Sequence, residues 1–127
     1  MKLDLLVVDD NEMMRSFLSH FFKKHFRIKT VENVHSAWDS LDKGYRPNLI
    51  LLDILFPNQN GLDFLKQLKG SILFNDIPVI ILSSLDKSVM KVECLSAGAA
   101  DYVTKPFNPN ELELRIHKQL KSQAVMI

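Results

Sequence analysis

Five short apolar runs, separated by stretches of helical periodicity, constrain the fold of this chain more than any other feature of its sequence. The runs are LDLLVV (3–8), FRIKTV (26–31), LILL (49–52), PVIIL (78–82) and ADYVT (100–104). Strands that alternate with helices in this way are typical of a parallel sheet with right-handed crossovers. The sequence therefore predicts an α/β fold: a single three-layer, doubly wound sandwich around a five-stranded parallel sheet.

The patterns within the runs indicate where each strand lies. Three runs are continuously apolar, which suits strands covered on both faces. Residues 26–31 instead alternate between apolar and polar residues, so we expect this strand at an edge of the sheet.

The helices are predicted from the spacing of apolar residues and from capping residues. The first helix is expected to bury Met13, Phe17, Phe21 and Phe22, and the last to bury Leu112, Ile116 and Leu120. Asn11 and Asn108 are predicted N-caps, with Pro109 in the first helical position, and Gly98 is predicted to end the fourth helix.

Length and charge limit the possible partners. A chain of 127 residues fits one domain, which we place at residues 1–122, with 123–127 as a C-terminal tail or the start of a linker. Lys plus Arg (16) nearly balances Asp plus Glu (15), so no direct nucleic-acid binding is expected. No apolar run approaches the length of a membrane span, and we expect a cytoplasmic protein without membrane contact.

Polar residues follow the strands at the ends where ligands bind in open parallel sheets. Asp9 and Asp10 follow the first strand, Asp53 the third, Ser83 the fourth and Lys105 the fifth. Taken singly, the acids could be capping or turn residues, and Ser83 and Lys105 ordinary surface residues. Their joint placement at one edge favours a functional site.

This set of side chains is suited to phosphoryl chemistry. Three converging carboxylates repel one another and call for a divalent cation, and all-oxygen ligation favours Mg²⁺ or Mn²⁺ over zinc. Lys105 adds a positive charge, and the hydroxyl of Ser83 adds a donor. Asp53 could then attack a phosphoryl group as a nucleophile.

Four segments, LLVVDDNEMMR, LILLDILFPNQNGLDFL, PVIILSS and GAADYVTKPF, together resemble the receiver domain of two-component response regulators. The resemblance covers nearly the whole chain. It implies a flavodoxin-like fold with strand order 2-1-3-4-5, and a histidine kinase or phosphotransfer protein as partner. It also implies a cis peptide bond between Lys105 and Pro106.

The resemblance further assigns roles within the site. Asp53 would be the phosphoacceptor and would ligate Mg²⁺ together with Asp10 and the backbone carbonyl of Leu55, while Asp9 would act through water. Lys105 would pair with the phosphoryl group.

A second set of roles concerns switching and assembly. Ser83 would follow the phosphoryl group, and Tyr102 would turn inward as the aromatic switch residue. This movement would alter the face built from the fourth helix, the fifth strand and the last helix. Four charged residues on that face resemble the dimer contacts of winged-helix regulators, with Lys91 pairing with Glu111 and Asp101 with Arg115. A third pair is missing, since Ser96 and His117 occupy its positions.

Two other functions use related chemistry. An aspartyl phosphatase would need a second acid near Asp53, where Ile54 and Leu55 stand instead. A flavin-binding module would need a hydroxyl- and Gly-rich loop after the first strand, where the sequence is DDNEMM. We therefore expect a phosphoryl-accepting switch rather than an enzyme, limited to Mg²⁺-dependent self-phosphorylation and autodephosphorylation.

Overall fold

The computed structural model describes residues 2–54, 60–84 and 88–125, which form five strands alternating with five helices. The strands are β1 (Leu3–Val8), β2 (Phe26–Val31), β3 (Leu49–Asp53), β4 (Val79–Ser83) and β5 (Asp101–Thr104). The helices are α1 (Glu12–Phe22), α2 (Val34–Asp42), α3 (Asn60–Lys69), α4 (Ser88–Ser96) and α5 (Pro109–Val125). All strand pairs are parallel, in the order β2-β1-β3-β4-β5. The predicted flavodoxin-like fold is confirmed.

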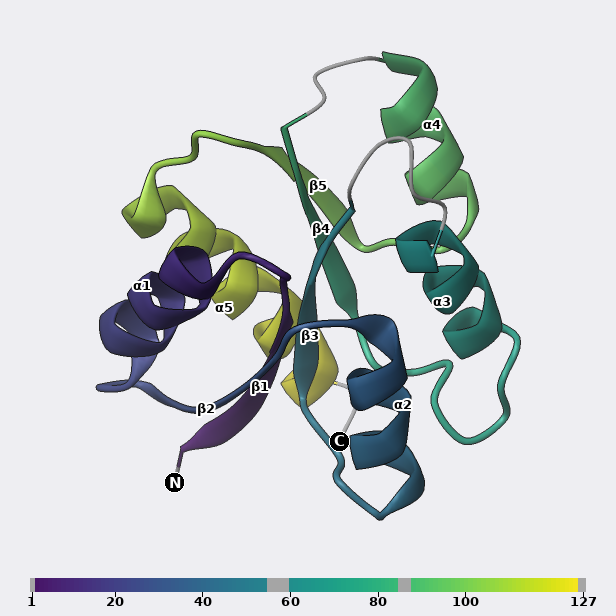
Figure 1. The fold of residues 1–127 in the computed structure, drawn as a ribbon, viewed down its shortest axis with the longest axis horizontal. Coiled ribbons are helices and arrows are strands. Elements are labelled where there is room, and N and C mark those ends of the chain that lie inside the picture. The colour runs from purple at the N-terminus through teal and green to yellow at the C-terminus, as the bar shows by residue number, and fades with distance from the viewer. Residues whose placement is uncertain (1, 55–59, 85–87, 126–127) are drawn as a thin grey trace.

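Two helical layers cover the sheet. Figure 1 shows α1 and α5 on one face and α2, α3 and α4 on the other. Alternate residues of the central strands enter two separate apolar cores: Leu5 and Val7 of β1 pack with α1 and α5, whereas Leu6 and Val8 face the other layer. Burial on both faces explains why these strands are continuously apolar.

The strand at 26–31 lies at an edge, as its alternating pattern predicted. β2 pairs with β1 from Leu3↔Phe26 to Val8↔Val31 and forms the outer end of the sheet. Phe26 is buried, whereas Arg27 and Lys29 are exposed. An edge strand with one wet face needs polar residues at alternate positions.

The predicted capping residues occupy the expected places. The Asn11 side chain accepts a hydrogen bond from the Met14 amide, and the Asn108 side chain accepts one from the Asn110 amide. Gly98 follows α4 with φ of +109°, a conformation that favours glycine. A Cβ there would also lie 2.7 Å from Cγ of Lys69, so space as well as backbone conformation requires glycine.

The predicted buried stripe of the first helix is partly wrong. Met13 and Phe17 are 83% and 43% exposed, whereas Leu18 and Phe22 are fully buried. The helix carries two apolar stripes one residue apart, and only its attachment to β1 decides which one faces the sheet. The stripe predicted for α5 is confirmed, because Leu112, Ile116 and Leu120 are all buried.

The last helix passes through the predicted end of the domain. α5 continues to Val125, beyond the boundary expected after residue 122, so helical structure extends into the segment expected to be a tail. The functional boundary itself stays a prediction. Within the described part of the chain, we find no helix that combines the length and the apolar character needed to span a membrane.

Candidate functional site

The predicted polar residues converge at the carboxyl edge of the sheet. Asp9 and Asp10 directly follow β1, Asp53 ends β3, Ser83 ends β4 and Lys105 directly follows β5. Parallel pairing aligns these ends, with Asp53 opposite Leu82 and Ser83 opposite Thr104. The local fold therefore brings five side chains from distant parts of the sequence to one place.

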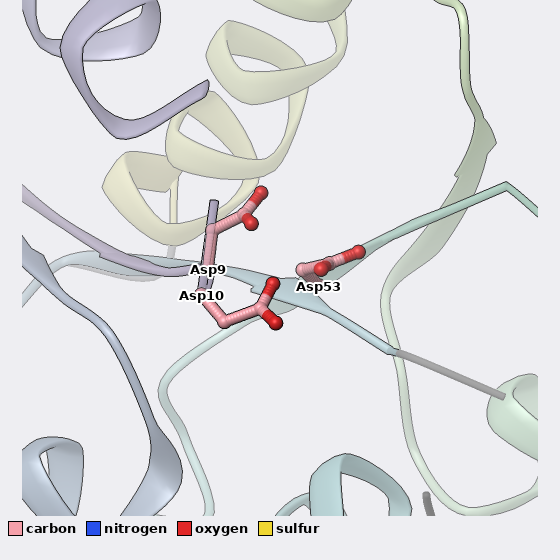
Figure 2. A group of neighbouring side chains, drawn as sticks. All are labelled: Asp9, Asp10 and Asp53. Atoms are coloured by element: carbon pink, nitrogen blue, oxygen red, sulfur yellow. The ribbon is translucent and has the colours of Figure 1, made fainter. Parts of the chain in front are cut away.

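Three carboxylates form the acidic part of the site. One oxygen from each of Asp9, Asp10 and Asp53 lies within 4.8 Å of the others. Figure 2 shows the three side chains close together, with Asp9 and Asp10 just after the end of β1 and Asp53 at the end of the neighbouring β3. Their exposures differ, since Asp9 is 2% exposed while Asp10 lies open to solvent. Three hard oxygen donors, one of them accessible, fit a Mg²⁺ or Mn²⁺ ion.

Lys105 connects two of these acids. Its Nζ donates hydrogen bonds to Asp53 Oδ1 at 3.0 Å and to Asp9 Oδ2 at 3.2 Å. The side chains of Asp9 and Asp53 are only 1% and 3% exposed, so this ammonium group supplies the positive charge that buried carboxylates need. Lys105 thus contacts two of the predicted site acids directly, while its pairing with a phosphoryl group stays a prediction.

Burial and neighbouring charges shift the pKa values of Asp53 and Lys105. Burial raises the pKa of Asp53 to about 6; the hydrogen bond from Lys105 opposes this shift, and the negative charge of Asp9 adds to it. Burial disfavours the charged form of Lys105, but Asp53 and Asp9 outweigh that effect and raise the pKa of its ammonium group. Asp53 is therefore a carboxylate whose negative charge is only partly compensated.

Asp9 is held by its neighbours at every polar atom. Its amide donates to the Val31 carbonyl at 3.1 Å, and its Oδ1 accepts from the Asn11 amide at 2.9 Å. Its carbonyl oxygen accepts a hydrogen bond from Nη1 of Arg15 at 2.8 Å. Arg15 was not predicted as a site residue, because nothing in the sequence of a helix's first turns indicates that an arginine there contacts a backbone carbonyl of the site.

A cavity of about 130 Å³ lies beside the acids. Besides the three aspartates, its lining includes Glu32 and Asn60. A water-sized group needs roughly 10–15 Å³ by a comparable measure, so the cavity has room for a phosphoryl group or a hydrated cation. The predicted carbonyl ligand, Leu55, lies outside the described residues.

The predicted switch residues lie next to the site in the sheet. Ser83 is fully buried, and its carbonyl accepts a hydrogen bond from the Lys105 amide at 2.7 Å. Tyr102 is opposite Ile81 in the β4–β5 pairing, so Ser83, two residues further along β4, lies on the same face of the sheet. Tyr102 is already buried in this structure. The peptide bond between Lys105 and Pro106 is cis, as the resemblance implied.

The predicted interface charges gather away from the acids. Arg115 donates to Asp101 Oδ2 at 2.7 Å and to Glu111 Oε1 at 3.2 Å, so it is paired within its own chain. Nζ of Lys91 lies 5.9 Å from the ring centroid of Tyr102. Lys91 therefore lies over the ring of Tyr102, the predicted switch residue, as well as on the predicted interface.

Comparison with known proteins identifies the family of this chain. The model of the response regulator receiver domain matches residues 5–117. The phosphate regulon transcriptional regulatory protein PhoB of Klebsiella pneumoniae is 38% identical over 113 residues, covering 88% of this chain and 49% of PhoB. The chain thus spans about half the length of this curated relative.

Two further matches come from histidine kinases. Histidine kinase P4 of Formosa agariphila is 33% identical over 122 residues, which cover 96% of this chain and 9% of the kinase. The solved receiver domain of a signal transduction histidine kinase from Syntrophus aciditrophicus superimposes with a TM-score of 0.84 at 30% identity, covering 94% of this chain and 91% of that one. Together with the family model, these matches show that the chain belongs to the response regulator receiver domains of two-component signalling.

Proposed function

We propose that Asp53 accepts a phosphoryl group from a histidine kinase or phosphotransfer protein, and that the resulting charge switches the face formed by α4, β5 and α5. The observation that carries this proposal is the cluster in which Lys105 contacts both Asp9 and Asp53 beside an accessible Asp10. A buried carboxylate next to a lysine and two further acids has the parts that phosphoryl transfer requires.

The transfer step can be written with these residues. A carboxylate oxygen of Asp53 attacks the phosphorus of a phosphohistidine, the new P–O bond forms as the P–N bond breaks, and the electron pair leaves with the imidazole. Lys105 neutralises charge on the transferred oxygens from its position 3.0 Å from Asp53. Asp53 ends a strand that is paired on both sides, so the backbone that carries this carboxylate is held in place.

Asp10, Asp53 and, through water, Asp9 are the residues we propose for holding a Mg²⁺ or Mn²⁺ ion. Such an ion, when bound, would supply positive charge next to the oxygens of the transferred group. Asp10 is the exposed member of the set, so it suits an ion that keeps part of its water shell. The donor set is all oxygen, which fits this choice of ion.

The switch would begin at Ser83. A phosphoryl group adds about two negative charges and strong acceptor oxygens, which would attract the buried hydroxyl of Ser83 and the ammonium of Lys105. Tyr102 lies on the same face of the sheet as Ser83 and is covered by Lys91 of α4. A shift of Ser83 would therefore change the packing of Tyr102 against α4, and phosphorylation would bias an equilibrium between two packings.

A dimer through the α4-β5-α5 face is the assembly that we propose for the switched form. The two helices of this face carry exposed apolar side chains, namely Val89, Val92 and Leu95 of α4 and Leu114 of α5. Arg115 and Asp101 lie at the same face and already pair within the chain. A two-fold dimer could exchange such pairs between subunits at no net change in charge.

Mass spectrometry of the intact protein tests the acceptor. Incubation with acetyl phosphate and Mg²⁺ should add a single phosphate, and EDTA should prevent the addition. Asp53→Asn should give no adduct, while Asp42→Asn, which removes an exposed acid elsewhere, should react like the wild type. An adduct that survives Asp53→Asn would sink the proposal, as would continuous release of phosphate from an unrelated phosphomonoester.

Sedimentation tests the dimer. Beryllofluoride with Mg²⁺ should raise the sedimentation coefficient of the wild type. Arg115→Glu should weaken this dimer, because it places like charges at the paired positions. Lys43→Glu, just after the end of α2, reverses an exposed charge away from the face and should leave the dimer unchanged. Equal dimerisation of Arg115→Glu and the wild type would dispose of this interface.

A further inference from the structure

Next to the acids, an arginine side chain binds the backbone rather than a carboxylate. Arg15 of α1 directs Nη1 to the carbonyl oxygen of Asp9, at 2.8 Å, instead of to a carboxylate. Because it uses the carbonyl, both carboxylate oxygens of Asp9 stay available to the Asn11 amide and to Lys105. Arg15 thus joins the site without competing for its acidic oxygens.

The carbonyl that Arg15 holds controls the neighbouring acid. The C=O of Asp9 and the N–H of Asp10 belong to one planar peptide unit. Fixing the carbonyl therefore fixes the plane from which Cα of Asp10 emerges, and with it the direction of the Asp10 side chain. Among the described residues, no group donates a hydrogen bond to the exposed carboxylate of Asp10, so its direction depends on the backbone.

The other hydrogen bonds of this segment all hold Asp9, the residue that precedes the Asp9–Asp10 peptide bond. The Asp9 amide is bound to Val31 of β2, and the Asp9 side chain is bound to Asn11 and Lys105. Without Arg15, the amide and side chain of Asp9 would still be held. The Asp9 carbonyl would lose the one hydrogen bond that it accepts from the described residues, so the plane of the Asp9–Asp10 peptide could rotate. The consequence would appear at Asp10.

We propose that Arg15 is a positioning residue for the cation site: by holding the Asp9 carbonyl, it orients Asp10 as a metal ligand. This inference rests on the proposed function, since it takes Asp10 to be a direct ligand. Outer hydrogen bonds of this kind typically change metal affinity by about 10- to 100-fold when they are removed. α1 would then contribute to metal binding through one side chain.

The direction of the change in Mg²⁺ affinity distinguishes a lost charge from a lost orientation of Asp10. Arg15 carries a positive charge close to the acids, so removing that charge would, by Coulomb's law alone, strengthen the binding of Mg²⁺. Losing the orientation of Asp10 would weaken it. Weaker binding in an arginine-free variant therefore cannot come from the lost charge.

The experiment compares Mg²⁺ dissociation constants of the whole chain by isothermal titration calorimetry. Arg15→Met keeps the alkyl stem and removes all donors, and it should raise the dissociation constant about tenfold or more. Arg15→Lys keeps one donor and should give an intermediate value. Arg46→Met is the matched control, because Nη1 of Arg46 also donates to a backbone carbonyl, that of Leu73, far from the acids.

Each outcome decides a different question. Wild-type protein that does not bind Mg²⁺ overturns the proposed metal site. Wild-type binding with an equal or smaller dissociation constant in Arg15→Met overturns the role of Arg15 and leaves the proposed function standing. Partial unfolding of Arg15→Met would lower the measured number of sites rather than their affinity, and a weakening matched by Arg46→Met would also reject a specific role for Arg15.

Discussion

Two clusters in this domain have the same charge composition, one cation between two carboxylates, but differ in their surroundings. Lys105 joins Asp9 and Asp53 at the carboxyl edge, where all three side chains are less than 20% exposed. Arg115 joins Asp101 and Glu111 on the α4-β5-α5 face, where the arginine is 40% exposed. The difference in burial should set both the strength of each cluster and what it can do.

In the first cluster, two buried carboxylates share one lysine, so a net negative charge is held out of contact with water. Water is largely excluded there, so the acids interact strongly with Lys105 and with one another, and the site responds to added charge such as a cation or a phosphoryl group. In the second cluster, solvent screens the ions and each pair contributes little to stability. The exposed cluster is better suited to partner choice than to holding the fold together.

The largest expected effect is the loss of the buried cation. Lys105→Met should lower the free energy of unfolding by about 4 kcal/mol in EDTA near pH 8, because two buried carboxylates lose their partner. Added Mg²⁺ should restore part of this loss by supplying a positive charge. Urea denaturation followed by circular dichroism measures both. A loss below about 1 kcal/mol would mean that burial does not distinguish the two clusters.

The next effect is a pH dependence that belongs to Asp53. With its pKa raised from 3.8 to about 6 in the folded protein, protonation of Asp53 stabilises the fold. This contribution is fully present below the unfolded pKa and is lost as the pH rises through about 6, amounting to about 3 kcal/mol.

Asp53→Asn should remove that dependence. In EDTA, the variant should gain stability relative to the wild type as the pH rises from 4 to 8, and urea denaturation across this range measures the difference. Asp42→Asn serves as the control on an exposed acid. Parallel pH profiles for the wild type and Asp53→Asn would show that Asp53 titrates normally.

A smaller effect is expected at the exposed cluster. Arg115→Met should lower the free energy of unfolding by about 1 kcal/mol or less, since half-exposed pairs are screened and the helix around Arg115 is held by the buried Leu112 and Ile116. The same denaturation assay applies. A loss as large as that of Lys105→Met would contradict the distinction drawn from burial.

The smallest effect is the response of each cluster to salt. Raising NaCl from about 0.05 to about 0.5 M should reduce the difference between the wild type and Arg115→Met by a few tenths of a kcal/mol. The difference between the wild type and Lys105→Met, measured in EDTA, should change proportionally less, because buried ions are screened less. Equal fractional salt sensitivity of the two differences would indicate that solvent reaches both clusters alike.

Much of the fold was predictable because apolar patterning reports burial directly. Continuously apolar runs identified the central strands, and the alternating run at 26–31 identified an edge strand. The choice between the Met13–Phe17 and Leu18–Phe22 stripes of α1 was not predictable, because both have helical spacing and the sheet selects one. That choice depends on how the chain leaves β1, which is a tertiary property.

The site residues that were predictable are those that end a strand or directly follow one. Asp53 and Lys105 were expected to meet, and they lie 3.0 Å apart. Arg15 could not be found in this way, because its partner is a backbone carbonyl, which every residue possesses. Side chains that act on the backbone leave no complementary residue type in the sequence.

The edge position of β2 also bears on how copies of this chain can meet. A free strand edge offers unpaired backbone groups to another strand, and proteins commonly block such addition with charge. Arg27 and Lys29 project from β2 as exposed cations, with Arg27 held by Asp4 through two hydrogen bonds and Lys29 over the ring of Tyr45. Two copies joined along this edge would bring these cations together, so the charges on β2 disfavour sheet extension and aggregation along that edge.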